Sequence, residues 1–234
     1  MISPLLLLSS LLAASAEDYP DPRMVIVGAT GAGKSSIANA LLGCEPQGSG
    51  CLFEVCSSAA SCTSQTTMGS GPWLGQGTNQ DFTVVDTPGF GDSEGRDSEF
   101  LVEMMDVLDN QLGYTNIIIL VLEGGEPRFG EPLYAMLRQM SSIFGAAWWE
   151  FMIVGVSKWS YSQAAIDSRN QTCTNFPDKC QDEQWFIREF NAQFQEKFGL
   201  TKNFTYAFID SWSQTIPNIE DPRPHPAAAL EAGD

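Results

Sequence analysis

Residues 28 to 35 combine three glycines with a lysine and a final serine, in the order Gly28, Ala29, Thr30, Gly31, Ala32, Gly33, Lys34, Ser35. The glycines let the backbone curl so that successive N–H groups point inward toward phosphate oxygens. Lys34 supplies an ammonium for the outer phosphates, the Ser35 hydroxyl is suited to ligate magnesium, and Ser36 is placed to contact the α-phosphate. The spacing therefore predicts a phosphate-binding loop (P-loop) for a purine nucleoside triphosphate with Mg²⁺.

The segments on either side of this loop give it the required setting. Residues 24–27 are apolar and mostly β-branched, which is typical of a strand buried on both faces. Apolar residues then recur at helical spacing from 37 to 42, and Gly43 stands where a helix ends. A strand, a glycine-rich loop and a helix in this order are the context in which a P-loop functions.

Asp86 is the second candidate, because it directly follows the apolar run 82–85. A carboxylate at the end of a core strand is where a P-loop protein needs its magnesium aspartate. Asp86 opens the segment Asp-Thr-Pro-Gly, in which Gly89 allows a backbone N–H to approach the γ-phosphate.

The rest of the chain alternates between strand and helix patterns. Apolar runs at 117–122, 151–156 and 206–209 predict strands, and helical spacing predicts helices near 100–108, 133–144 and 185–198. This alternation predicts an α/β fold: a three-layer P-loop NTPase (G domain) whose mostly parallel, doubly wound sheet is flanked by helices. We expect residues 43–80 to form a long irregular loop with one short strand at 52–55, and residues 160–181 to form an inserted loop.

Several stretches resemble the AIG-type GTPases, also called immunity-associated nucleotide-binding proteins (GIMAP/IAN), of the translation-factor-related P-loop class. They are the P-loop, Asp-Thr-Pro-Gly-Phe-Gly-Asp-Ser at 86–93, Arg-Phe at 128–129 and Ile-Phe-Gly at 143–145. Septins and chloroplast import receptor GTPases have similar motifs. The resemblance covers residues 23–212 and implies GTP or GDP and Mg²⁺ as cofactors.

The resemblance also implies the remaining ligand contacts. A threonine of the 43–80 loop should close on the metal as switch I; Thr66 is our choice in Ser64-Gln65-Thr66-Thr67, with Thr67 as the alternative. The metal set is therefore Ser35, Thr66 and Asp86. The base-contacting set is Ser157, Lys158, Ser211 and Trp212, and either Trp159 or Trp212 stacks on the base or belongs to the core. Ser160 stands where most GTPases have the aspartate that binds guanine, so ATP remains the alternative ligand.

Hydrolysis is expected to be slow. Phe90 occupies the place of the water-orienting glutamine of Ras-like enzymes, and its side chain cannot polarise water. Arg96, Arg128 or dimerisation through the switch face would accelerate the reaction, and we assign no catalytic residue. Two functions are open: a switch-type GTP-binding protein with slow turnover, or a secreted or luminal interaction module that keeps the fold with little or no turnover.

The first 16 residues carry a short apolar run that ends in Ala14-Ser15-Ala16, which predicts a signal peptide; an uncleaved N-terminal anchor is the alternative. The G domain would then span residues 17–216, followed by a disordered, proline-rich tail at 217–234. Six cysteines and the sequons at Asn170 and Asn203 suit a disulfide-bonded glycoprotein that is secreted or resides in the endoplasmic reticulum lumen. A cytoplasmic location is the other possibility.

The cysteines fall into two groups. Cys173 and Cys180 bracket a short segment and are expected to pair with each other. Cys44, Cys51, Cys56 and Cys62 cluster in one stretch, with zinc binding as the alternative to disulfides.

Composition limits the partners. The chain has 234 residues, of which 43% are hydrophobic, and a formal net charge of −17. This length and hydrophobic content predict one folded domain. The negative charge excludes nucleic acid and anionic lipid as favoured partners. The expected partners are a guanine nucleotide and a second copy of the chain.

Overall fold

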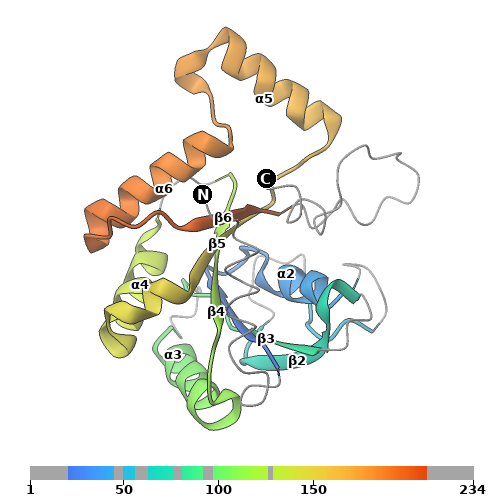
Figure 1. The fold of residues 1–234 in the computed structure, drawn as a ribbon, viewed down its shortest axis with the longest axis vertical. Coiled ribbons are helices and arrows are strands. Elements are labelled where there is room, and N and C mark those ends of the chain that lie inside the picture. The colour runs from blue at the N-terminus through green and yellow to red at the C-terminus, as the bar shows by residue number, and fades with distance from the viewer. Residues whose placement is uncertain are drawn as a thin grey trace.

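A six-stranded sheet forms the centre of this computed structural model, which describes residues 21–44, 50–55, 63–75, 81–91, 97–125 and 129–209. Along the sheet the strands are β2 (Thr67–Pro72), β3 (Asp81–Asp86), β1 (Arg23–Gly28), β4 (Ile117–Glu123), β5 (Met152–Ser157) and β6 (Thr205–Phe208). β2 runs antiparallel to β3, and the other neighbouring strands are parallel (Figure 1). The predicted α/β fold with a mostly parallel sheet is confirmed.

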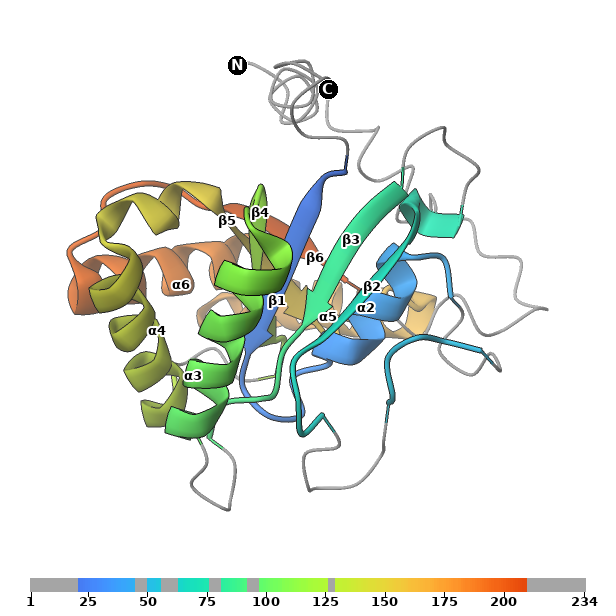
Figure 2. The same cartoon turned by 90° about the horizontal axis from the view of Figure 1, so that it is seen from below.

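Helices cover both faces of this sheet. They are α2 (Lys34–Leu41), α3 (Asp97–Asp106), α4 (Glu131–Phe144) and α6 (Glu183–Phe198), and a further helix, α5 (Gln163–Asn175), stands apart from the sheet (Figure 1). A π-helical turn (η2, Val107–Leu112) extends α3, and η1 (Trp73–Gly75), η3 (Ala146–Phe151) and η4 (Pro177–Lys179) are short 3₁₀ turns. Figure 2 shows α2 on one side of the sheet and α3, α4 and α6 on the other. None of the helices within the described ranges is long and apolar enough to cross a membrane.

Two hydrophobic clusters join the layers. In β1, Val25 and Val27 face the cluster beneath α3, α4 and α6, whereas Met24 and Ile26 face the cluster beneath α2. All four side chains are at most 2% exposed, as expected for a central parallel strand covered on both faces. The burial fixes β1, and therefore the start of the P-loop, in the middle of the sheet.

The first part of the predicted loop at 43–80 differs from our expectation. The short strand expected at 52–55 is absent, and the strand β2 lies at Thr67–Pro72 instead. β2 is an edge strand that contains Gly69, Gly71 and Pro72. These residues are poor strand formers, and an edge strand needs no apolar alternation on its exposed side. The sequence pattern therefore could not indicate it.

The expectation of an inserted loop at 160–181 was wrong, because this segment contains the helix α5. The Ser162 hydroxyl caps α5 by accepting a hydrogen bond from the Ala165 N–H at 3.3 Å. No residue of α5 is buried, so the helix has no apolar face that periodicity could detect. The predicted disulfide between Cys173 and Cys180 is present and joins α5 to the segment after η4.

A second disulfide, between Cys44 and Cys51, anchors the segment that follows α2. The buried Asn39 side chain reinforces it, because its amide group donates to the Phe53 carbonyl at 2.8 Å and accepts from the Phe53 N–H at 3.1 Å. The disulfide removes Cys44 and Cys51 as thiolate ligands, which argues against the zinc alternative. Cys56 and Cys62 lie outside the described residues.

Candidate nucleotide-binding site

The P-loop connects the buried end of β1 to the first turn of α2. Gly33 is the N-cap residue of α2, with φ of +90°, a conformation that side chains rarely adopt, and no side chain caps the helix. The first backbone N–H groups of α2 therefore face the loop, where the positive end of the helix dipole favours an anion. Lys34 is buried and donates to the Ala29 carbonyl at 3.0 Å, across the loop.

Asp86 at the end of β3 meets the start of α2. The Ser35 hydroxyl donates to Asp86 Oδ2 at 2.6 Å, while Asp86 Oδ1 is buried without a hydrogen-bond partner. A buried carboxylate oxygen without a partner is costly, and it is the kind of hard oxygen ligand that Mg²⁺ prefers. The donor set of Ser35 and Asp86 therefore fits a magnesium ion.

Burial changes the acid–base properties of both charged groups. It lowers the pKa of Lys34 from 10.5 to about 8, although the nearby Asp86 charge opposes this change. Burial also raises the pKa of Asp86, against hydrogen bonds from Ser35 and Thr63 and the charge of Lys34. The site thus disfavours the charged form of each group. A counter-charge added by a ligand would reduce the cost of burying these charges.

The Asp-Thr-Pro-Gly segment is bound to the P-loop along its backbone. The Thr30 N–H donates to the Phe90 carbonyl at 2.9 Å, and the Phe90 N–H donates to the Gly28 carbonyl at 3.2 Å. Gly89 lies so close to the P-loop that a β-carbon there would sit 2.3 Å from the Thr30 α-carbon. Only glycine fits this contact, which brings the Gly89 backbone against the P-loop. The Phe90 side chain is buried in the core beneath α3, α4 and α6.

The switch I segment places a different threonine near the metal ligands. Thr63 Oγ1 lies 3.1 Å from Ser35 Oγ and also hydrogen-bonds Asp86. Thr66 lies against α3, where its N–H donates to Glu103 Oε1 at 2.7 Å, and its buried hydroxyl has no partner among the described residues. Sequence reasoning missed Thr63, because its position depends on the pairing of β2 with β3, which sets Thr67 opposite Asp86.

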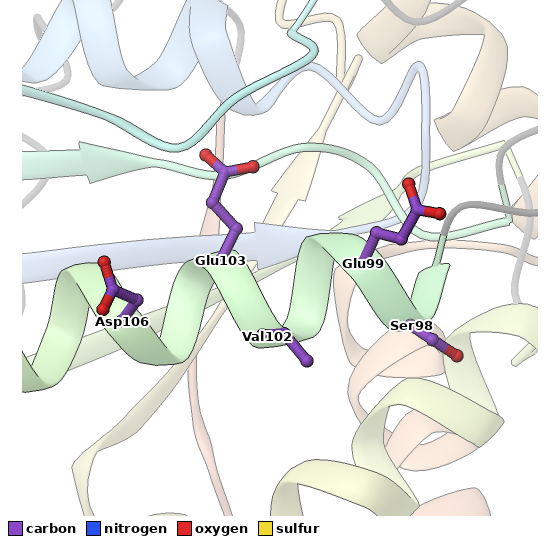
Figure 3. Close-up of a pocket in the computed structure, with 5 residues that line it drawn as sticks. All are labelled: Ser98, Glu99, Val102, Glu103 and Asp106. Carbon is purple, nitrogen blue, oxygen red and sulfur yellow. The ribbon is translucent and has the colours of Figure 1, made fainter.

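A cavity of about 590 Å³ lies along α3 rather than at the P-loop. Figure 3 shows Glu99 and Glu103 projecting from one side of α3 and Val102 from the opposite side. The lining contains three carboxylates and no cation. Such a surface repels phosphate, so this cavity is a poorer candidate for a nucleotide site than the P-loop.

The segment predicted to contact the base divides into inward-facing and outward-facing residues. The buried Ser157 hydroxyl donates to the Ala32 carbonyl of the P-loop at 2.6 Å and lies 3.2 Å from the Leu122 carbonyl. Lys158, with φ of +55°, forms an ion pair with Glu123 at 2.9 Å. Ser157 therefore positions the P-loop.

The next two residues behave differently from each other. Trp159 is buried and packs edge-on against Phe186 and Phe208, so it belongs to the core. Ser160 is exposed and hydrogen-bonds Ser162 at 3.1 Å. Ser211 and Trp212 lie outside the described residues, as do Arg96 and Arg128.

Comparison with solved structures finds the same fold in chloroplast proteins. Toc33 from Arabidopsis thaliana in complex with GDP and Mg²⁺ is 15% identical, with a TM-score of 0.53 over 88% of this chain and 76% of that chain. A dimerization-deficient Toc33 mutant is 15% identical, with a TM-score of 0.54 over 88% of this chain and 77% of the mutant chain. A structure from work on dimerization and GTPase activity of the chloroplast translocon components atToc33 and psToc159 is 15% identical. Its TM-score is 0.57 over 88% of this chain and 76% of that chain.

At this level of identity the similarity shows the fold alone. Comparison with curated protein sequences finds no match. A model of the AIG1 family matches residues 22–164, more than half of the 234 residues. The matched segment includes the P-loop, Thr63, Asp86 and Ser157. The chain therefore belongs to the AIG1 family.

Proposed function

We propose that this protein binds GTP and GDP with Mg²⁺ and acts as a switch with slow hydrolysis. The observation that carries the proposal is the contact of Ser35 with Asp86 beside Lys34, with the second Asp86 oxygen unpaired. Ser35, Asp86 and a switch I threonine would hold the metal, and bound Mg²⁺ would neutralise charge on the outer phosphates. Lys34 would regain a counter-charge from the same phosphates.

Guanine preference rests on family membership and on the bound GDP of Toc33. Within the chain, Ser157 supports the P-loop, and the Lys158 stem would pack along the base. Ser160 offers one hydroxyl in place of a carboxylate, so it provides weaker discrimination between guanine and adenine. ATP binding is therefore the outcome that a direct comparison must test.

Slow hydrolysis follows from the position of Phe90. Its side chain is 2% exposed within the core, so it neither contacts nor polarises an attacking water. Dimerization is important for the GTPase activity of the translocon components atToc33 and psToc159, and we propose that self-association through the switch face accelerates turnover here. An interaction module with little turnover is the second candidate, favoured by Phe90 and Ser160 together.

The first test compares GTP, GDP and ATP binding by calorimetry, with and without Mg²⁺. We expect guanine nucleotides to bind in a Mg²⁺-dependent manner and Lys34→Ala to weaken GTP binding at least about 100-fold, because the charge-assisted contacts to two phosphates are lost. Lys197→Ala, which changes a half-buried lysine at the end of α6, is the matched control. Absence of binding by any nucleotide would refute the proposal, and a preference for ATP would refute its guanine part.

The depressed pKa of Lys34 predicts a pH dependence of affinity. Bound phosphates favour the ammonium form of Lys34, so above pH 8 the binding of GDP requires Lys34 to take up a proton. GDP affinity should therefore fall by up to about tenfold per pH unit between pH 8 and 9. Fluorescence titrations of a labelled GDP would measure it. The Lys34→Ala variant, measured over the same pH range, shows any effect that comes from titration of the guanine base. If GDP affinity changes equally with pH in both proteins, the prediction is contradicted.

The two switch I threonines give a matched pair. If Thr63 closes on the metal, Thr63→Ala should reduce the Mg²⁺-dependent gain in affinity for a non-hydrolysable GTP analogue about tenfold, from loss of one metal contact. Thr66→Ala should leave that gain unchanged, because Thr66 is held against α3 by its backbone. The reverse pattern would restore Thr66 as the metal ligand.

We also propose that the protein enters the secretory pathway. Two disulfides support this compartment, and the sequon residues Asn170 and Asn203 are both exposed. Expression of the full chain in animal cells should yield a glycosidase-sensitive product that begins near Glu17, and Asn170→Gln with Asn203→Gln should abolish the mobility shift. An unglycosylated cytosolic chain that retains Met1 would contradict the proposal.

A further inference from the structure

We propose that a cavity at the carboxyl ends of β4 and β5 binds a small polyanion that carries phosphate or carboxylate groups. The cavity has a volume of about 360 Å³ and lies between the domain body and residues 163–181, which we call the α5 hairpin. This volume lies within the range of small-molecule sites in proteins. The α5 hairpin stands apart from the three layers of the fold in Figure 1.

Three cationic side chains line this cavity: Lys158, Arg169 and Lys179. None of the lining residues is acidic, although the chain has 29 acidic residues and only 12 lysines and arginines. Like charges gathered at one cavity repel one another, and an anion between them converts this repulsion into attraction. The charge of the cavity is therefore opposite to that of the protein as a whole.

The cations are held by aromatic rings more than by carboxylates. The Arg169 guanidinium lies 4.6 Å from the centre of the Trp159 ring, and the Lys179 ammonium lies 5.3 Å from that of Phe176. Within the described part of the chain neither cation forms an ion pair. Lys158 pairs with Glu123, but both side chains are substantially exposed, at 49% and 36%, where such pairs contribute little. All three cations can therefore contact a ligand.

Trp159 forms part of the cavity wall. It is 5% exposed, and its indole N–H is buried without a hydrogen-bond partner among the described residues. The indole nitrogen is a donor only, and leaving it unpaired is costly. The three cations specify a ligand rich in acceptor oxygens.

The cavity is distinct from the phosphate-binding loop. Its Trp159 and Phe186 belong to the cluster beneath α3, α4 and α6, whereas Ile37 of α2 belongs to the cluster on the opposite face of the sheet. The cavity shares Lys158 and Ser160 with the segment expected to contact the base, and the Ser157 hydroxyl, which contacts the P-loop, lies on the residue before Lys158. The Cys173–Cys180 disulfide closes the α5 hairpin and fixes Lys179 relative to Arg169.

Calorimetric titration of the oxidised, nucleotide-free protein tests the proposal with glucose 6-phosphate and tricarballylate as probes and glucose as the neutral control. We expect at least one polyanion to bind and the double variant Arg169→Gln, Lys179→Gln to weaken it at least about tenfold. Lys197→Gln makes the same type of charge change outside the cavity and should have no effect. Which probe binds identifies the oxyanion as phosphate or carboxylate.

Lys34→Ala separates this cavity from the P-loop, and it should leave polyanion binding unchanged. In ¹⁵N spectra, the indole resonance that disappears in Trp159→Phe should be the one that shifts on titration of the wild type. Thermal unfolding confirms that each variant is folded. Binding lost in Lys34→Ala, binding unaffected by the double variant, or no binding of either probe would each overturn the proposal.

Discussion

The hydrogen bond from Ser35 to Asp86 is the contact on which the site depends. It joins the first turn of α2 to the end of β3, and it holds a buried carboxylate near the buried ammonium of Lys34. Burial opposes the charge on both groups, because it lowers the pKa of Lys34 and raises the pKa of Asp86. The folded chain therefore retains an arrangement that is electrostatically costly, and a magnesium–phosphate ligand would complete it.

The sheet keeps these groups in register. Ile26 of β1 pairs with Asp86 of β3 and with Ile119 of β4, so the P-loop and the aspartate leave the sheet side by side. Backbone hydrogen bonds between Phe90 and the P-loop extend the pairing beyond the strands. Because β1 is buried on both faces, this edge of the sheet has little freedom to move, and the site is preorganised.

Disulfides anchor two segments near the ends of the site. Cys44–Cys51, together with Asn39, fixes the start of the segment that leads to switch I, and Glu103 holds Thr66 just before β2. Cys173–Cys180 closes the α5 hairpin, which has no buried residue of its own. The disulfide stabilises α5 in place of the apolar packing that this helix lacks. Disulfides of this kind suit an oxidising compartment.

The sequence by itself determined the P-loop, Asp86, the core strands and the main helices. These features depend on local composition: glycine spacing, runs of β-branched residues and apolar periodicity. Tertiary structure decided the rest. Edge strand β2 and exposed helix α5 have no periodic apolar face, and the choice between Thr63 and Thr66 depends on how β2 pairs with β3. The cation-lined cavity joins residues from separate helices and loops. Contacts between segments distant in the chain are set by the fold, and no local pattern encodes them.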